Sequence, residues 1–500
     1  MVARGNAQRR TVVGSRVTLD VGFRSSRGPI LIALMLTSFL VAIEATVLST
    51  AVPSIVADLG GFEQFPWLFS VYLLAQAVTV PIYSKLADMV GRKPIILIGI
   101  GLFLVGSILS GFADSMLALI IFRAIQGIGA GAVLPIAITI AGDIYTVQER
   151  AKVQGYLASV WAIAAVVGPT VGGLFAQFDA WRGIFFVNIP LGLFAMWMLV
   201  RNYKETVERR THRVDYAGAA LIASGFSLIL LAVLEGGNSW EWNSPTSFAL
   251  FGVGGLLLVA FVFVESRAAE PIIPLWVFSR RLLVAATFLG LGIGAMLTGL
   301  TSYVPVYLQG ALGVPPIVAG LSLATLTIGW PIAAALSGRL YLRIGFRSTM
   351  IIGMVLLLVG TVTLAAFAFS PSVPIVAAAS FVIGLGLGLV ATPSLIFAQS
   401  SVGWEDRGVV TGLNLFSRSV GSAVGIAIFG AIANSVFFAA GGNADDPAVI
   451  EAAASTVFIA VAIAAVLTFV ATLAMPQGHV APLETPATPD EPGEAAAKPA

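Results

Sequence analysis

Residues 94–113 read PIILIGIGLFLVGSILSGFA, and residues 84–93 directly before them read SKLADMVGRK. The first stretch has 20 residues and no charged side chain, and an α-helix of about that length crosses the hydrocarbon core of a bilayer. Across all 500 residues, 58% are hydrophobic and 10% are charged, against roughly 25% charged in a soluble domain. Mean hydropathy is +0.96. The chain is therefore predicted to be an all-α integral membrane protein.

Similar apolar runs recur along the chain and predict fourteen transmembrane helices with both termini on the same side. The predicted limits are 29–51, 66–87, 94–113, 116–142, 153–177, 183–200, 216–236, 247–265, 283–308, 316–338, 349–369, 374–398, 409–434 and 453–475.

The Lys and Arg residues test this count, because they collect in cytoplasmic loops. Of the 27 basic residues, 24 fall on one side of the membrane when the spans are placed as above. Arg182 lies in a loop on the other side, and Arg123 and Arg418 lie within spans. This distribution predicts that both termini are cytoplasmic. No cleavable signal peptide is expected, because residues 1–28 contain no apolar core.

An internal repeat divides the chain into two related parts. A set of glycines and one arginine recurs 257 residues later. The repeat predicts a six-helix bundle over 29–200 and another over 283–475. A cytoplasmic linker and two inserted helices occupy 201–282. Residues 1–28 are expected to be a basic cytoplasmic segment, and 476–500, rich in Pro, Ala and Glu, a disordered cytoplasmic tail. The matching pairs are Gly127 with Gly384, Gly129 with Gly386, Gly131 with Gly388, Arg150 with Arg407, and Gly155 with Gly412.

Several kinds of site are excluded by composition. The chain has no cysteine, and its two histidines, His212 and His479, lie in polar stretches. Disulfides, thiolate nucleophiles and cysteine-based metal sites are thereby excluded, and a buried histidine metal site is not expected. None of the five lysines follows a glycine, so the chain has no Gly-Lys-Ser/Thr phosphate loop. ATP is not expected to be the direct energy source, and no cofactor is expected.

Of the 25 acidic residues, only Glu44 lies deep in a predicted span. A charge at the bilayer centre costs about 2.5–3.5 kcal/mol on insertion scales, which makes such groups functional candidates. Arg123 is its natural partner, because both lie roughly 12–14 Å below the outer surface at the helical rise per residue. Burial favours a neutral carboxyl and a nearby guanidinium favours the ionised form, so a change in their separation changes proton affinity. We predict a proton-coupling pair; the alternative is a static ion pair that joins two helices.

Other polar and aromatic residues in the spans are candidates for the lining of a substrate cavity. Gln126 lies one turn from Arg123, and Trp330 and Tyr72 offer aromatic surface to a lipophilic or cationic compound. Arg418 could line the cavity, or it could snorkel or serve packing. The predicted cavity residues are Tyr72, Gln76, Gln126, Trp330 and Arg418.

The stretch SKLADMVGRK resembles the signature loop of the major facilitator superfamily, whose pattern is Gly-x-Leu-x-Asp-x-x-Gly-Arg-Lys. Ser84 stands in place of the first glycine. The resemblance implies a cytoplasmic charge network in which Asp88 locks one conformation, with Arg150 as a suitable partner. Membrane topology alone would explain the two basic residues of the loop but not its aspartate and glycine. The residues implied in gating are Asp88, Gly91, Arg92, Lys93 and Arg150.

Two further motifs lie in the fourth and fifth spans. RAIQGIG at 123–129 is similar to the proton-linked arginine motif of the superfamily, and GPTVGG at 168–173 resembles its antiporter motif, which is associated with exporters. Physically, a proline weakens the helix ladder and glycines admit a neighbouring backbone, which gives a bent and tightly packed gate. The residues concerned are Gly168, Pro169, Gly172 and Gly173.

Residues 44–53 and the stretch WRGIFFVNIP at 181–190 resemble the fourteen-span drug:proton antiporters of the QacA/EmrB type, in which the first acid is usually Asp. The resemblance implies the major facilitator fold with two inserted helices. It also implies export of lipophilic or cationic drug-like compounds driven by protons. The alternative is a dedicated exporter of one endogenous metabolite or lipid. An enzyme is not expected. The expected partners are lipid, protons and a small molecule, with no nucleic acid and no metal, for a monomer in the cytoplasmic membrane.

Overall fold

The computed structural model describes residues 21–145, 147–205, 215–368, 372–403, 406–440 and 446–476. Most of the predicted amino-terminal segment and nearly all of the predicted tail lie outside these ranges. Some side chains within the helices, including those of Asp88 and Arg150, also lie outside the description.

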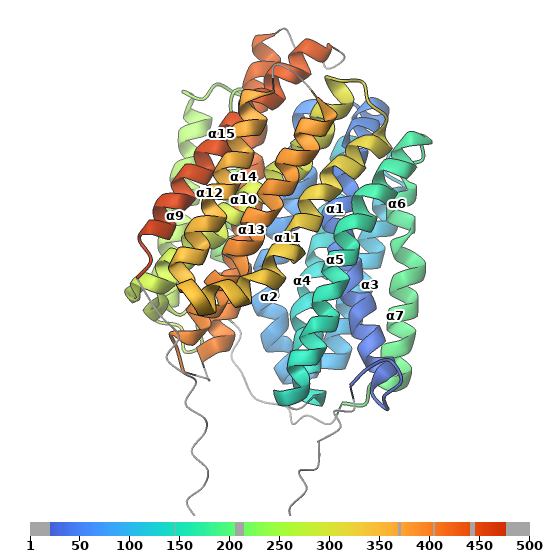
Figure 1. Cartoon of the computed structure of the whole chain (residues 1–500), viewed down its shortest axis with the longest axis vertical. Coiled ribbons are helices and arrows are strands. Elements are labelled where there is room, and N and C mark those ends of the chain that lie inside the picture. Colours follow the sequence, from blue (N-terminus) through green and yellow to red (C-terminus); the bar gives the residue numbers. More distant parts are fainter. Residues whose placement is uncertain are drawn as a thin grey trace, which may run out of the picture.

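Each predicted span coincides with a helix of the structure (Figure 1). The bounds are α1 (Gly28–Leu59), α2 (Phe65–Val90), α3 (Arg92–Gly111), α4 (Met116–Ile144), α5 (Val147–Gln177), α6 (Gly183–Phe186), α7 (Asn188–Asn202), α8 (Tyr216–Glu235), α9 (Pro245–Glu265), α10 (Arg281–Gly310), α11 (Pro316–Ile344), α12 (Phe346–Ala366), α13 (Val373–Ser400), α14 (Arg407–Ala439) and α15 (Pro447–Leu473), with short 3₁₀ helices η1 (Phe62–Gln64) and η2 (Leu275–Ser279). Among the described residues, thirteen segments are long and apolar enough to cross a membrane. Among these thirteen, α6 and α7 count as one segment. The predicted span that is not among them corresponds to the 26-residue helix α2.

The sixth predicted span is found as one apolar segment, Gly183–Asn202, within which the helix is interrupted at Val187 between α6 and α7. Pro190 lies one turn beyond Phe186 and has no N–H to donate to the carbonyl of that residue, which weakens the helix at this point. The division places Asn188 at the start of α7, beside the buried face of α1.

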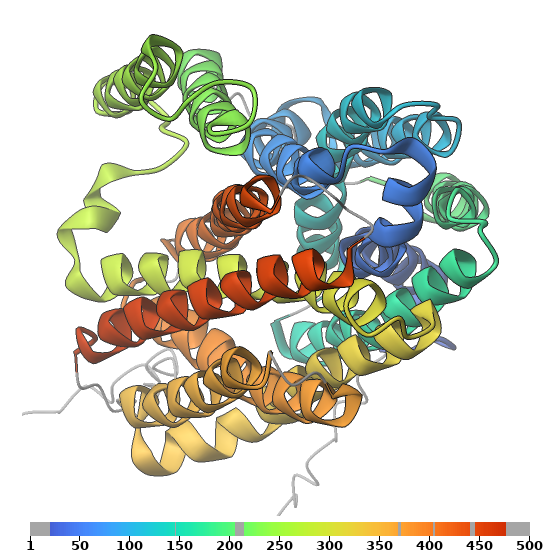
Figure 2. The ribbon, with the colours of Figure 1, turned by 90° about the horizontal axis from the view of Figure 1, so that it is seen from above.

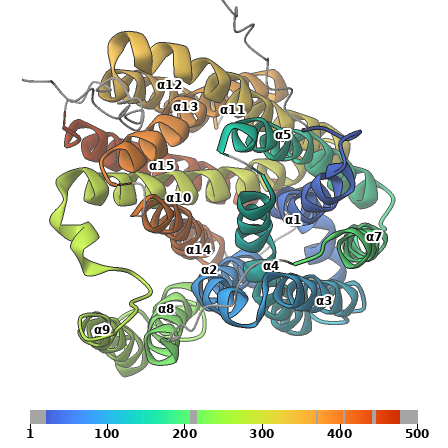
Figure 3. The ribbon, with the colours of Figure 1, turned by 90° about the horizontal axis from the view of Figure 1, so that it is seen from below.

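The helices pack in two groups with an attached pair, as Figures 2 and 3 show from the two ends. In the first group α1 packs on α5, and both α2 and α3 pack on α4. In the second group α10 packs on α14, and both α11 and α12 pack on α13. The helices α8 and α9 pack on each other, and α8 contacts α2 and α14, so the pair touches both groups. The domain boundaries given above stay a prediction.

The two groups meet through α5 with α11, α2 with α14, and α1 with α10. The helix α1 begins, and the helix α15 ends, toward the bottom of Figure 1. This end of the bundle is called the lower end. Toward the opposite, upper end, Gln309 on α10 donates to the carbonyl of Thr50 on α1 at 3.1 Å. Asn434 on α14 donates to the carbonyl of Glu63 in η1 at 2.9 Å. The two groups are therefore tied together near their upper ends.

Candidate functional site

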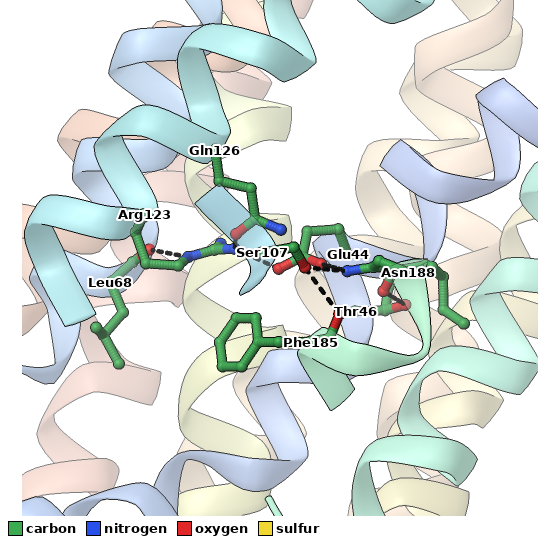
Figure 4. Close-up of polar contacts among 9 residues, drawn as sticks. Glu44, Thr46, Leu68, Ser107, Arg123, Gln126, Phe185 and Asn188 are labelled. Atoms are coloured by element: carbon green, nitrogen blue, oxygen red, sulfur yellow. Dashed lines mark hydrogen bonds and ion pairs between the residues drawn. The ribbon is translucent and has the colours of Figure 1, made fainter. Parts of the chain in front are cut away.

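Glu44 on α1 and Arg123 on α4 form a fully buried ion pair. Arg123 donates from Nη1 to Glu44 Oε1, and Asn188 at the start of α7 donates from Nδ2 to Glu44 Oε2 at 2.8 Å. Figure 4 shows the carboxylate lying between the guanidinium and the amide. Both oxygens of the carboxylate are thus engaged, by groups from two different helices.

The guanidinium of Arg123 has further partners, and all of them are uncharged. Its Nε donates to the carbonyl of Leu68 on α2 at 3.2 Å, and its Nη1 donates to Gln126 Oε1 at 2.6 Å. The ring of Tyr72 lies 4.2 Å from the guanidinium carbon. Within the described residues, the buried Tyr72 hydroxyl and Gln126 Nε2 have no hydrogen-bond partner. Two polar groups beside the ion pair therefore keep hydrogen-bonding capacity that the described side chains do not use.

A second layer of hydrogen bonds fixes the amide of Asn188. Its Nδ2 also donates to Ser107 Oγ on α3 at 3.0 Å, and that hydroxyl donates to the carbonyl of Phe185 at 2.9 Å. Asn188 and Ser107 were not among the predicted site residues. Asn188 was detectable, because it lies within the family-like stretch 181–190, whereas a serine in an apolar span gives no signal of its own.

The predicted cavity residues fall into two places in the structure. Tyr72 and Gln126 contact Arg123 and so belong to the ion-pair site. On the other side, Trp330 on α11 and Arg418 on α14 lie together, with the guanidinium carbon 5.2 Å from the ring centroid. Gln76 is half-buried on α2, one turn below Tyr72. Their role in substrate binding stays a prediction.

The signature loop holds the start of α3. Gly91 has φ of 120°, which favours glycine, and a Cβ built there would lie 2.7 Å from Glu205 Oε2. Glu205 accepts from the backbone N–H of Arg92 at 2.5 Å and of Lys93 at 3.4 Å. A carboxylate at this place satisfies free N–H groups of the helix and complements its dipole. Glu205 was not among the predicted residues, because it lies more than 100 residues from the loop.

We expect Gly91→Val to lower the free energy of unfolding by about 1–3 kcal/mol, because it forces a β-branched residue into a left-handed conformation and displaces a capping carboxylate. Thermal unfolding of the purified protein would measure this change. Gly101→Val on the same helix is the matched control, since a Cβ at Gly101 meets no atom within 4 Å. Equal midpoints for the two variants would contradict the assignment.

The basic residues of the loop reach two neighbouring helix ends. Arg92 pairs with Asp143 near the end of α4 at 2.9 Å, and Lys93 donates to the carbonyl of Tyr203 at 2.6 Å. Burial, with the nearby carboxylates of Glu205 and Asp143, raises the pKa of Tyr203 to about 12, so its hydroxyl stays protonated at neutral pH. The side chains of Asp88 and Arg150, which were predicted to pair, lie outside the part of the chain that the structure describes.

The antiporter-like motif lies where α5 meets two other helices. A Cβ at Gly172 would lie 2.1 Å from the carbonyl oxygen of Val47, and one at Gly168 would lie 1.9 Å from Thr46 Oγ1, both on α1. A Cβ at Gly173 would instead lie 2.7 Å from the carbonyl oxygen of Pro316 on α11. The glycines thus permit close approach within one group of helices and also between the groups.

The carbonyl of Pro169 also takes part in these contacts. It accepts a hydrogen bond from Thr50 Oγ1 on α1 at 3.3 Å. A Cβ built at Gly320 on α11 would lie 2.3 Å from the same oxygen.

In the described part of the chain, no group of three or more His, Cys, Asp or Glu side chains could hold a metal ion.

Comparison with known proteins gives a consistent set of relatives. The sequence pattern that describes the Major Facilitator Superfamily matches residues 34–426. Multidrug resistance protein 3 of Bacillus subtilis (strain 168) is 35% identical over 410 residues, which are 82% of this chain and 80% of that protein. Multidrug transporter protein MdtP of the same strain is 34% identical over 414 residues, 83% of this chain and 76% of that protein.

A solved structure shares the fold at low sequence identity. An auto-inhibited peptide transporter of the POT family superposes with a TM-score of 0.67 at 16% identity, over 92% of this chain and 99% of that chain. The chain therefore shares the all-helical fold of that protein.

Proposed function

Because the chain belongs to the Major Facilitator Superfamily, and is thus a secondary transporter and not an enzyme, we propose that it is a proton-coupled antiporter that exports lipophilic, drug-like compounds. The proposal draws on two relatives that are named for multidrug resistance or multidrug transport. We assign it to the fourteen-span drug:proton antiporters, in the cytoplasmic membrane, with the lower end and both termini cytoplasmic. It needs no cofactor and works as a monomer.

The buried contact between Glu44 and Arg123 carries the proposal. If Glu44 takes up a proton, Arg123 keeps Gln126 Oε1, the carbonyl of Leu68 and the face of the Tyr72 ring as partners. Its charge is then not stranded, although an unpaired buried charge is costly. A protonated carboxyl can still accept a hydrogen bond from Asn188. The surroundings thus accommodate both protonation states, as a site that loads and unloads a proton requires.

Protonation of Glu44 can affect the packing of the other helices through α1. Protonation removes the charge from the contact between α1 and α4, and charge-assisted hydrogen bonds are about twice as strong as neutral ones. The helix α1 packs on α5 and also contacts α10 of the other group. In the proposed cycle Glu44 takes a proton from the outside as substrate leaves there. The proton is lost to the cytoplasm as the two groups of helices rock about the central cavity.

Proton movement in liposomes tests this function. The purified full chain would be reconstituted, and the internal pH would be followed after addition of ethidium, pyrenebutanol or pyrenebutyrate, which are a cation, a neutral compound and an acid. A substrate is expected to dissipate an imposed pH gradient in liposomes that contain the protein and not in empty ones. The absence of any substrate-dependent proton movement across a broad panel would reject proton antiport.

The breadth of the same panel separates the proposal from its alternative, a dedicated exporter of one endogenous metabolite or lipid with the same machinery. Several unrelated compounds that each move protons would support multidrug export. A single saturable compound would support the dedicated exporter.

A further inference from the structure

Arg418 is a charged side chain in the middle of the bundle, and no acidic side chain in the part of the chain that the structure describes pairs with it. Within the described residues it forms neither a hydrogen bond nor an ion pair, and its one polar contact is the ring face of Trp330. It lies 11 residues after the start of α14 at Arg407, about 16 Å along the helix at the α-helical rise. That depth exceeds the reach of an extended arginine side chain, so Arg418 does not snorkel to the lower surface.

Arg418 lies inside the bundle, and its side chain remains partly accessible there. Trp330 belongs to α11, so the side chain points from α14 into the bundle. Both side chains are half-buried, so neither is enclosed by packing. By contrast, Arg123 is fully buried and held by Glu44, Gln126 and Leu68. The two intramembrane arginines therefore differ: within the described residues Arg123 has an acidic partner and further hydrogen bonds, whereas Arg418 has neither.

The balance of charge in the central part of the spans is positive. Every acidic residue of the spanning helices other than Glu44 lies within five residues of a helix end. Both oxygens of Glu44 are already engaged by Arg123 and Asn188. A cationic compound would therefore find no free carboxylate at this depth, and it would be repelled by Arg418. A compound with an anionic group would find a guanidinium with free N–H donors and an aromatic face beside it.

We propose that Arg418 and Trp330 form the part of the substrate site that selects lipophilic acids, in which Arg418 binds a carboxylate or similar anionic group and Trp330 packs on the apolar body. The inference rests on the proposed export function, because it names the class of compound that the cavity takes. It explains why an arginine without an acidic partner is placed in the membrane, where charges are otherwise expensive. Lipophilic acids are thereby preferred to the lipophilic cations that the aromatic residues alone would suggest.

Binding to the detergent-purified full chain tests this selectivity without any need for proton coupling. The probes are pyrenebutyrate, pyrenebutanol and pyrenebutylammonium, which share one apolar body and differ in charge. The wild-type protein is expected to bind the acid at least about tenfold more tightly than the alcohol, and the cation most weakly, as one charge-assisted contact implies. Arg418→Gln should weaken the acid to the level of the alcohol and leave the alcohol unchanged, and Arg418→Lys should recover part of the difference.

Arg343→Gln is the matched control, because it removes one arginine charge from an exposed position at the lower end of α11. It should bind all three probes like the wild type. Equal affinity of wild type and Arg418→Gln for the acid, or tighter binding of the cation than of the acid, would overturn the inference. If the acid preference is found but no probe moves protons in liposomes, the proposed antiport fails and the anion site stands.

Discussion

Glu44→Gln is expected to abolish pH-driven export and to leave substrate exchange without a gradient intact. The new side chain is nearly isosteric, and its amide oxygen can still accept from Arg123 Nη1 in place of Glu44 Oε1. Its amide group would face Asn188 Nδ2, and the Asn188 amide can turn to accept. The fold should therefore survive. The variant loses the ability of a carboxyl group to take up and release a proton.

The measurement uses liposomes with an imposed pH gradient and a compound that the wild type exports. The rate for Glu44→Gln should fall to that of empty liposomes, whereas counterflow of the same compound should continue. Glu44→Asp is the control, because it keeps a titratable carboxyl one methylene closer to α1 and should retain part of the pH-driven rate. Undiminished pH-driven export by Glu44→Gln would show that the ion pair only joins α1 to α4.

Gly173→Leu is expected to hold the upper ends of the bundle apart and to stop transport. A Cβ at this position would already lie 2.7 Å from the carbonyl oxygen of Pro316 and 3.1 Å from the Cα of Ile317. These are backbone atoms of α11, which cannot move aside without the helix. Overpacking of this kind costs about 1–3 kcal/mol, which would shift the balance between conformations by roughly five- to 150-fold against the closed upper end.

The absence of native cysteines makes the shift measurable by spin labels. Cysteines at the exposed positions Gln177 on α5 and Leu321 on α11 would report the distance between the two upper helix ends. Gly173→Leu should lengthen this distance, while Gly101→Leu should leave it unchanged, because a Cβ at Gly101 meets no atom within 4 Å. An unaltered distance together with normal transport would mean that the α5–α11 contact does not limit the cycle.

The order of the membrane helices could be predicted from the sequence, and each helix end to within eight residues. Hydropathy and the positions of Lys and Arg are read along the chain. Neither depends on which helices are neighbours in the fold. The pairing of Glu44 with Arg123 was also predictable, because two charges at one depth in a low-dielectric environment have few other partners. The division of the sixth span at Val187 was missed, although Pro190 was a signal for it.

The partners that complete each site were not predictable in this way. Asn188, which holds the second oxygen of Glu44, and Glu205, which caps α3, lie more than 100 residues from the groups that they bind. Which side chains meet depends on how each helix is rotated about its axis. A helix that is apolar on all sides carries little information about that rotation.

The sequence by itself therefore determined that the chain is a bundle of membrane helices, how they follow one another, and which few charges lie inside it. The tertiary structure decided which groups those charges meet: Arg123 is paired with Glu44, while Arg418 lies against Trp330 and meets no acid among the described residues. The physical reason is that the cost of burying a charge depends on its depth, which the sequence gives. Whether that cost is offset depends on hydrogen bonds and ion pairs a few ångströms long, which only the packed helices provide.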